Sequence, residues 1–341
     1  MRKVVVTGSA GFIGGYLVAE LLRRGYAVTG LDNLSKYGKV TRSYDSHPRY
    51  QLVEGDARDT GLLTALLADS DHFVAGAAMI GGISYFHAYP YDLLAANERI
   101  IAACCDAAIS AHRRGRLRKV TYLSSSMVFE NAADWPSEEG QQLRIPPPSS
   151  SYGFQKLAVE YFARAAWDQY RLPYTIVRPF NCVGTGEGRA LGAGQVQSGN
   201  VALAMSHVVP DLVQKVLKGQ DPVHILGSGE QVRHYTYGGD LAAGIAAAME
   251  HPAARNEDFN LSTARATTVR ELAGLIWAKI NGPGRPVRLV HDEPFEHDVQ
   301  RRVPAVAKAR TVLGFEATTS LEQSLDEVIP WIREAIAAGV I

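Results

Sequence analysis

The sequence has few cysteines, no net charge and no long apolar run, and each lack excludes a class of protein. Cys104, Cys105 and Cys182 are an odd, sparse set with two adjacent members, which disfavours a disulfide framework and favours a reducing compartment. Basic and acidic residues both number 35, so no net charge attracts nucleic acid or an acidic membrane surface. No segment has the roughly 20 apolar residues of a membrane helix, and the N-terminus lacks the pattern of a signal peptide. We therefore expect a soluble cytoplasmic protein without nucleic-acid or membrane partners.

Short apolar segments rich in β-branched residues recur through the first half of the chain, with helical patterns between them. We predict strands at residues 3–6, 27–31, 50–53, 72–75, 119–123 and 174–178. Between the first two, Ile13, Leu17 and Leu21 share one helical face, and Gly25 marks the end of the helix. Strands alternating with helices imply right-handed crossovers and a parallel sheet covered on both faces. The prediction is an α/β fold with a Rossmann-type doubly wound parallel sheet in residues 1–180.

The character of the sequence changes after Arg178. Residues 184–200 are rich in glycine and polar residues, which is typical of a loop. Further helices are expected around residues 209–218, 240–250, 269–280 and 321–338. We predict that residues 181–341 form a smaller C-terminal α/β domain, which closes over the carboxyl edge of the sheet and binds the substrate.

A glycine-rich stretch, VVVTGSAGFIGG, follows the first predicted strand and opens the first predicted helix. Gly8, Gly11 and Gly14 are spaced as in a loop that turns tightly and lets the backbone approach a pyrophosphate closely. The N-terminus of the helix then presents unpaired N–H groups to the phosphates. Asp32 ends the second strand, where a carboxylate accepts hydrogen bonds from both ribose hydroxyls and repels a 2′-phosphate. The expected cofactor is therefore NAD(H) rather than NADP(H).

Several motifs follow one another in a recognisable order: TGSAGFIGG, LDNLS, EGDARD, a serine run, YGFQK and RPFNCVG. With these motifs the chain resembles the extended short-chain dehydrogenases/reductases, which include the nucleotide-sugar epimerases and dehydratases. The resemblance extends to GSGEQVRHYTYGGDLAAGI and HDVQRRVPAVAKARTVLGF near the C-terminus, and so covers essentially the whole chain. Ala75 and Gly76 replace the family's usual His-Leu pair, a departure that affects packing beside the pyrophosphate.

The resemblance implies a set of cofactor-binding residues. In the family, the aspartate of the GD-x-RD motif contacts the adenine, alanines after the fourth strand line the site, and an asparagine on the following helix supports it. Carried over to this sequence, the expected set is Gly8, Gly11, Phe12, Ile13, Gly14, Asp32, Asn33, Ser35, Asp56, Ala57, Ala77, Ala78, Asn97, Tyr152, Lys156 and Pro179.

The resemblance also assigns a catalytic trio. Tyr152 corresponds to the family's general base and acid, and Lys156 lies one helical turn further on. A free tyrosine has a pKa near ~10, so we expect the Lys156 ammonium and the positive nicotinamide to lower the pKa of Tyr152. Lys156 is also expected to hydrogen-bond the nicotinamide ribose. Ser125 is the third member because it stands three residues before Val128, and its neighbour Ser126 is an alternative.

The residues after Ser125 discriminate between reactions of the family. The 4,6-dehydratases carry Asp-Glu directly after their catalytic threonine, whereas Ser126 and Met127 stand here. Nucleotide-glucuronate decarboxylases usually keep a glutamate at the position of Met127, and the 3,5-epimerising relatives carry a cysteine there. Asp32 disfavours the NADPH that the GDP-fucose synthase relatives consume. The pattern is most like that of the 4-epimerases.

The second half is expected to hold a nucleotide-diphosphate sugar. Arg233 is the first choice for the diphosphate, because a guanidinium can bind phosphate through two hydrogen bonds, and Arg301 or Arg302 is the second choice. Asn181 is expected to contact the diphosphate or the sugar. The other residues expected at the substrate are Ser125, Ser126, His207 and Val208, although a structural role for His207 is an equal alternative. In this family the helices near residues 93–111 and 152–170 would pair across a two-fold axis, which gives a homodimer with a four-helix interface.

We therefore predict NAD-dependent epimerisation of a nucleotide-diphosphate sugar at C4, through a transient 4-keto intermediate and a tightly bound NAD. Two alternatives are open. One is another nucleotide-sugar reaction of the same family, by a decarboxylase, dehydratase or ketoreductase. The other is an NAD(H)-binding sensor without catalysis. The ten histidines show no metal-binding spacing, so no metal is expected.

Overall fold

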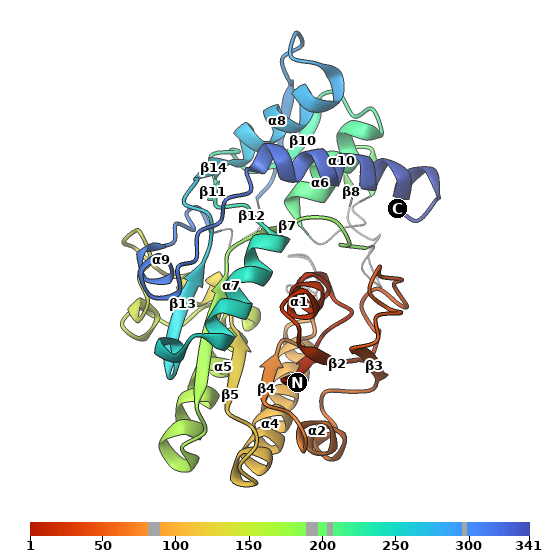
Figure 1. Ribbon diagram of the computed structural model, residues 1–341. Helices are drawn as coiled ribbons and strands as arrows, with labels where there is room; N and C mark the ends of the chain where they lie inside the picture. The colour runs from red at the N-terminus through yellow and green to blue at the C-terminus, as the bar shows by residue number, and fades with distance from the viewer. Residues whose placement is uncertain (81–88, 189–196, 203–206, 295–298) are drawn as a thin grey trace.

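The protein is described here from a computed structural model that covers residues 1–80, 89–188, 197–202, 207–294 and 299–341 (Figure 1). Residues 189–196 of the predicted glycine-rich loop therefore lie outside the described residues. The six strands predicted in the first half are all present, within one residue of the expected ends. They are β1 (Lys3–Thr7), β2 (Ala27–Asp32), β3 (Tyr50–Glu54), β4 (His72–Ala75), β5 (Lys119–Leu123) and β6 (Tyr174–Pro179).

These strands form one parallel sheet in the order β13-β6-β5-β4-β1-β2-β3, which confirms the predicted Rossmann-like α/β fold. The seventh strand, β13 (Glu257–Leu261), comes from the second half of the chain and pairs with β6 along its length. A division at residue 180 separates β13 from the sheet it completes. The predicted boundary follows the motifs of the sequence, whereas the sheet takes strands from both sides of it.

Helices cover both faces of the sheet, because each has an apolar stripe that packs against the buried strands. The helices α2 (Thr60–Leu67), α4 (Pro90–Arg113) and α5 (Ser151–Tyr170) share one hydrophobic layer with the strands. The helices α1 (Phe12–Arg23), α7 (Gly238–Glu250) and α9 (Ala307–Leu313) share the other. In α1, Leu17 and Leu21 are buried as predicted, and the chain turns at Gly25 with a φ of 89°.

A second cluster of helices lies at one end of the molecule, beyond α1 and α7 (Figure 1). It consists of α6 (Val208–Leu217), α8 (Val269–Asn281) and α10 (Leu321–Ala337), which surround a separate hydrophobic core. All three helices were expected from the sequence. Short strands complete this part: β7 (Cys182–Val183), β8 (Gln197–Ser198), β9 (Val201–Ala202), β10 (Val223–Leu226), β11 (Val232–Arg233), β12 (Thr236–Tyr237), β14 (Thr267–Thr268) and β15 (Leu289–Asp292). Three single-turn helices are η1 (Ser126–Phe129), η2 (Gln141–Leu143) and η3 (Pro252–Ala254).

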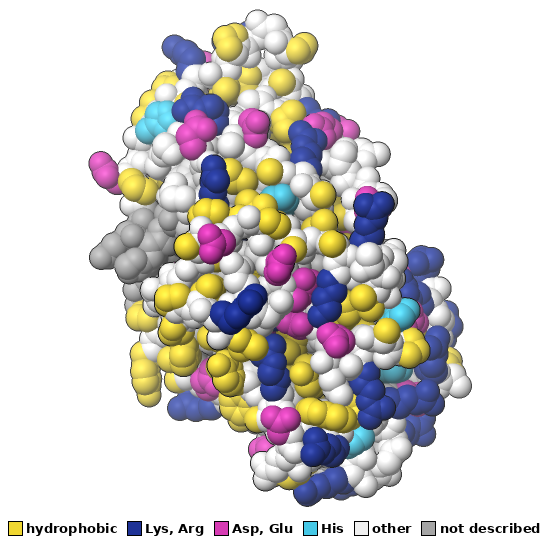
Figure 2. Space-filling view, turned by 90° about the vertical axis from the view of Figure 1, so that its left-hand side faces the viewer, with side chains coloured by type: hydrophobic (Ala, Val, Ile, Leu, Met, Phe, Trp, Pro, Cys, Tyr) yellow, Lys and Arg dark blue, Asp and Glu magenta, His cyan; other side chains and the backbone are white. Residues whose placement is uncertain are grey.

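The surface side chains reflect the equal numbers of basic and acidic residues in the sequence. Figure 2 shows basic, acidic and apolar side chains intermixed on the face that it presents. Among the described residues, no helix has both the length and the apolarity that a membrane span requires.

A buried ion pair ties α5 to the sheet. Glu160 and Arg178 both have side chains with 0% exposure, and their atoms lie 2.6 Å (Oε1 to Nε) and 2.8 Å (Oε2 to Nη2) apart. Arg178 also donates to Asp258 of β13 at 2.5 Å. Burial opposes the charge of Arg178, but Glu160 and Asp258 outweigh this effect and raise the pKa of the guanidinium. Ser124 and Gln142 donate to the two oxygens of Glu160 at 2.8 and 2.9 Å.

We expect Glu160→Gln to lower the free energy of unfolding by about 3 kcal/mol, because it leaves the buried Arg178 charge without its bidentate partner. Urea denaturation followed by circular dichroism would measure this change. The matched control is Glu322→Gln, which breaks an exposed pair with Arg265 and should cost less than about 1 kcal/mol. Equal losses in the two variants would contradict a structural role for the buried pair.

Candidate active and cofactor site

The loop between β1 and α1 leaves no room for a side chain at its glycine positions. Gly8 has a φ of 74°, which favours glycine, and its N–H donates to Leu31 O at 2.9 Å. A β-carbon added at Gly14 would lie 2.0 Å from Gly8 O, and one at Gly11 would lie 3.1 Å from the same oxygen. The loop therefore turns back tightly on itself. Because its glycines carry no side chains, a ligand can approach the backbone closely at these positions.

The N-terminus of α1 offers a place for an anion. Its N-cap residue is Gly11, and among the described residues no side chain caps this helix end or adds an acidic group to its first turn. Asp32 stands at the end of β2, where its Oδ2 accepts from Ala10 N at 3.0 Å and its Oδ1 from Leu34 N at 2.9 Å. Each oxygen keeps a second lone pair that can accept from a ribose hydroxyl. The donors of α1 and the acceptors of Asp32 fit an adenine dinucleotide.

Three of the predicted cofactor-binding residues, among them the one expected at the adenine, are held by local contacts. Asp56 accepts from Arg58 Nη2 at 2.6 Å and from Arg58 N at 2.8 Å. These hydrogen bonds with Arg58, opposed by partial burial, lower the pKa of Asp56, and a hydrogen bond with Asn33 contributes. Asn33 Oδ1 also accepts from Ser35 N at 3.1 Å. The predicted residues Asn33, Ser35 and Asp56 thus lie in one connected group beyond β2 and β3.

The loop after β4 lies against the glycine-rich loop. A β-carbon at Gly8 would lie 3.0 Å from Ala77 Cα, so the two backbones are in close contact. Gly76 is required as well, because a β-carbon there would lie 2.9 Å from Thr7 O. Asn97 uses both ends of its amide on Met79, accepting from its N–H at 2.7 Å and donating to its carbonyl at 3.0 Å, and so supports this loop from α4.

Ser125, Tyr152 and Lys156 lie together at the carboxyl end of β5. Ser125 follows β5 and forms a side-chain hydrogen bond with Tyr152, which stands in the first turn of α5. Lys156 Nζ lies 5.9 Å from the centre of the Tyr152 ring and donates to Leu123 O at 3.0 Å. The structure thus brings together all three members of the predicted trio.

Burial governs the charge of this trio in the ligand-free chain. It raises the pKa of Tyr152, while the hydrogen bond with Ser125 and the charge of Arg302 lower it in part. Burial also lowers the pKa of Lys156 to about 8. The expected lowering of the Tyr152 pKa by Lys156 is therefore not a property of the protein chain alone.

The serines on either side of Ser125 have different surroundings. Ser124 Oγ donates to Glu160 Oε1 at 2.8 Å and to Lys156 O at 3.3 Å, so it joins β5 to α5. Ser126 is 2% exposed and opens η1, whereas Ser125 Oγ accepts from Met127 N at 3.2 Å. The hydrogen bond with Tyr152 favours Ser125 over Ser126.

Glu130 is a residue whose role the sequence did not indicate. Its Oε2 accepts from Ser150 Oγ at 2.7 Å and from Ser150 N at 3.2 Å, directly before α5. A carboxylate is favourable at a helix N-terminus because it faces the positive end of the helix dipole. The family that this chain resembles usually has Tyr-Gly at positions 129 and 130, so the change to Phe129 and Glu130 is the one signal in the sequence.

Asn181 and Arg302 lie beside the trio. Asn181 follows β6 with a φ of 35°, a strained value for a residue other than glycine, and its buried Nδ2 has no hydrogen-bond partner among the described residues. Arg302 Nη1 donates to Asn181 Oδ1 at 3.5 Å, and its charge acts on both Tyr152 and Tyr235. Asn181 therefore offers a free donor next to a cation.

The other predicted substrate residues are placed differently. Arg301 is exposed, and its guanidinium lies 5.6 Å above the ring of Trp135. Arg233 is half-buried on β11, with Nη1 donating to Val232 O at 3.0 Å. His207 precedes Val208 at the start of α6, and its Nδ1 lies 2.5 Å from Oε1 of the buried Glu187. Of the two arginines proposed together, Arg302 is the one near Tyr152.

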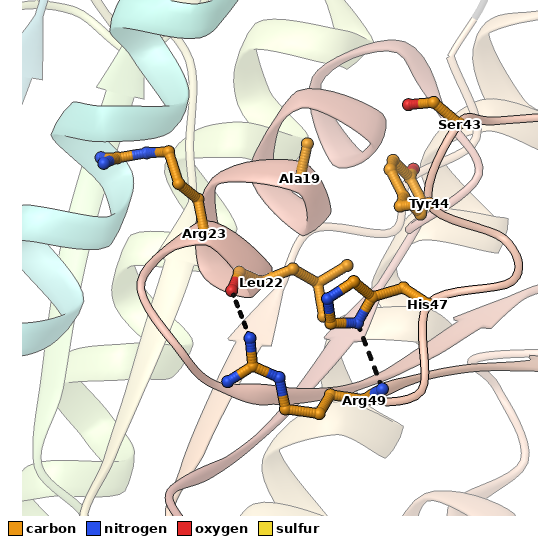
Figure 3. Close-up of a pocket in the computed structure, with 7 residues that line it drawn as sticks. All are labelled: Ala19, Leu22, Arg23, Ser43, Tyr44, His47 and Arg49. Atoms are coloured by element: carbon orange, nitrogen blue, oxygen red, sulfur yellow. Dashed lines mark hydrogen bonds between the residues drawn. The ribbon is translucent and has the colours of Figure 1, made fainter.

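A pocket of about 330 Å³ lies elsewhere, beside α1 (Figure 3). It is lined by Ala19, Leu22, Arg23, Ser43, Tyr44, His47 and Arg49. Arg49 is held there by a hydrogen bond to Leu22 O at 3.3 Å. None of the predicted site residues lines this pocket.

Known proteins resemble this chain over nearly its full length. The model of the NAD dependent epimerase/dehydratase family matches residues 4–262. A putative UDP-glucose 4-epimerase of Methanocaldococcus jannaschii is 27% identical over 332 residues, 97% of this chain and 98% of that protein. A UDP-N-acetyl-alpha-D-glucosaminuronate decarboxylase of Bacillus cytotoxicus is 26% identical over 338 residues, 98% of each chain. The crystal structure of a Thermotoga maritima UDP-glucose 4-epimerase with UDP-glucose has a TM-score of 0.79 and 27% identity, covering 98% of this chain and 100% of that one.

We expect Gly14→Ala to weaken NADH binding by at least about tenfold, because its β-carbon would force Gly8 O away and open the phosphate loop. Titration of NADH fluorescence would measure the affinity, and far-UV circular dichroism would check the fold. Gly274→Ala is the matched control, since Gly274 lies in α8 with nothing within 4 Å of an added β-carbon. Unchanged NADH binding by Gly14→Ala would contradict the assignment of the loop.

Proposed function

Because the chain belongs to the NAD-dependent epimerase/dehydratase family, we propose that it catalyses epimerisation of a nucleotide-diphosphate sugar at C4. The proteins that resemble this chain include an epimerase, a decarboxylase and a reductase. The choice among these reactions depends on the side chains that accompany Ser125, Tyr152 and Lys156. We propose that these three residues are the catalytic ones and that the predicted cofactor residues around the glycine-rich loop hold the NAD.

The observation that carries the proposal is the pair Ser126 and Met127 after Ser125. Elimination of water or loss of carbon dioxide in relatives of this kind uses an additional acidic side chain at these positions. Met127 cannot transfer a proton, and Ser126 is 2% exposed within η1. Glu130 is committed to Ser150 at the start of α5. A single base and acid is sufficient for removal and return of one hydroxyl proton.

We propose the following roles for the residues of the chain. Tyr152 Oη takes the proton of the C4 hydroxyl, and Ser125 Oγ hydrogen-bonds the same oxygen as it becomes a carbonyl. Bound NAD would supply the acceptor and donor for the C4 hydride, held by the residues around the glycine-rich loop and by Lys156. Lys156 holds the nicotinamide ribose and favours the Tyr152 phenolate. The 4-keto sugar turns over in the site, so that the hydride returns to the other face of C4, and Tyr152 gives its proton back to the C4 oxygen.

A sugar that turns over needs a firm hold on its diphosphate. We propose Arg302 and Asn181 for this role, because Asn181 offers an unpartnered buried Nδ2 and Arg302 supplies the charge beside it. Arg233, His207 and Val208 stay predictions for the same site. Arg301 is exposed and lies above Trp135, which makes it a weaker candidate than Arg302 for binding the diphosphate.

Assembly into a homodimer also stays a prediction. The helices α4 and α5 pack side by side and carry exposed aromatic side chains: Tyr91 (76%), Phe154 (46%) and Tyr161 (58%). Such exposed rings favour a contact with a second copy of the chain. Sedimentation velocity on the purified protein would test it, and a monomer at micromolar concentration would count against it.

We expect one sugar from a panel of UDP-, dTDP-, GDP- and CDP-sugars to give a product of unchanged mass that is inverted at C4. In heavy water this product should carry no deuterium on carbon, because the C4 hydrogen does not exchange with solvent in this mechanism. Mass spectrometry and NMR of the sugars would measure both properties. Loss of water or carbon dioxide, or deuterium on carbon, would assign a different reaction of the family. Absence of turnover on every sugar would favour the NAD(H)-binding sensor.

The accompanying variants assign the reaction to Tyr152. Tyr152→Phe should lower kcat by a factor of roughly 10² to 10⁴, since general base catalysis contributes about this much. Tyr161→Phe makes the same change at an exposed position of the same helix and should leave kcat unchanged. A Tyr152→Phe variant with normal kcat would show that another group accepts the proton.

Substitution of the two adjacent arginines tests which one holds the diphosphate. Arg302→Gln should raise KM about tenfold or more, because a charged hydrogen bond to phosphate contributes about 1.5–3 kcal/mol. Arg301→Gln should leave KM within about twofold, because the Arg301 charge is exposed. Steady-state kinetics on the active sugar would measure both values, and the reverse order would assign the diphosphate to Arg301.

A further inference from the structure

Arg42 lies on the glycine-rich loop although it belongs to the segment that follows β2. Its Nη2 donates to Ala10 O at 3.4 Å, between Gly8 and Gly11. A β-carbon added at Gly15, in the first turn of α1, would lie 3.0 Å from Arg42 Cζ. The guanidinium therefore packs flat against the part of the chain where a pyrophosphate is expected in this fold.

Arg42 forms no ion pair with an acidic side chain in the part of the chain that the structure describes. Its Nε is buried and has no hydrogen-bond partner within that part. Asp45 is close, but its Oδ2 accepts from the backbone N–H of Arg42 at 2.8 Å. Among the described residues, the Arg42 guanidinium has one hydrogen bond, of 3.4 Å, and a partly buried cation of this kind is costly unless an anion joins it.

Arg42 also touches the second half of the chain. A β-carbon at Gly186 would lie 2.4 Å from Arg42 Nη1, so the guanidinium lies directly against Gly186, whose φ of 88° favours glycine. The neighbouring Thr185 is hydrogen-bonded to α1: its N–H donates to Tyr16 Oη at 2.8 Å, and its Oγ1 lies 3.2 Å from the same oxygen. The guanidinium thus stands between the phosphate loop and the segment that follows β7.

We propose that Arg42 binds the diphosphate of the NAD cofactor and supplies the positive side chain that the glycine-rich loop itself lacks. The loop offers N–H donors and a helix dipole, whereas Arg42 adds a full charge with a free donor edge. A 2′-phosphate is the other possible anion at this end of the cofactor, but the Asp32 carboxylate next to Ala10 disfavours it. The inference goes beyond the proposed sugar reaction and holds whichever sugar is used.

The test is the affinity of Arg42→Gln for nucleotides, measured without any sugar. We expect less NAD to copurify with this variant, and its dissociation constants for NAD and ADP, obtained from competition with NADH fluorescence, to rise about tenfold or more. Competition by adenosine, which has no phosphate, should not change. Arg42→Lys should recover most of the affinity for NAD, because it restores the charge at this position.

Arg49→Gln is the matched control. Arg49 belongs to the same segment and donates to Leu22 O in the pocket of Figure 3, at the other end of α1, so nucleotide binding should equal that of the unchanged protein. An equal loss of adenosine and ADP binding in Arg42→Gln would overturn the proposal, since it would show damage to the loop. A loss confined to NADP would also overturn it and would assign Arg42 to a 2′-phosphate. Full NAD binding by Arg42→Gln would overturn it as well.

Discussion

The pair of Glu160 and Arg178 fixes the distance between α5 and the two strands that lie beneath it. Arg178 belongs to β6, Glu160 to α5, and Ser124, which donates to the same carboxylate, to the end of β5. Tyr152 and Lys156 stand on that helix, and Ser125 follows that strand. A shift of α5 would therefore separate the three groups from one another. Because both charges have 0% exposure, any such shift would expose or unpair one of them, at a cost of several kcal/mol.

The electrostatics of the trio suggest why such a rigid frame is useful. In the chain without ligand, burial raises the pKa of Tyr152, which favours its neutral form, and lowers the pKa of Lys156. Both effects come from removal of water, which also strengthens every charge that a ligand brings into the site. A buried tyrosine held near a cation is thus poised to respond to bound cofactor and substrate rather than to bulk solvent. The same reasoning applies to Asn181, whose buried Nδ2 has no partner within the described part of the chain and is available to a ligand.

Much of the fold could be predicted from the sequence, because its signals are local. The periodicity around Leu17 and Leu21 and the β-branched strands define the elements of the first half, and the spacing of Gly8, Gly11 and Gly14 defines the turn. Pairings between distant segments could not be predicted in this way. Nothing in the short run of β13 indicates that it joins β6, and Arg42 reaches the loop across more than 25 residues of sequence. The choice between Arg301 and Arg302 was equally hidden, since adjacent residues point to different sides of an extended chain.

The position of β13 also constrains how this protein can be remodelled. A chain cut after β6 would leave the sheet without its edge strand and without α7, so Val177 and Leu123, which pack in the same layer, would lose their cover. Residues 181–341 thus cannot be exchanged between relatives as one intact unit, because this part of the chain contributes β13 to the sheet and then leaves it again. New specificity must instead arise from substitutions and insertions in the segments that leave the sheet after β6 and after β13. A chimaera that keeps β13 in the sheet would need two junctions, one before β13 and one after it, rather than a single crossover.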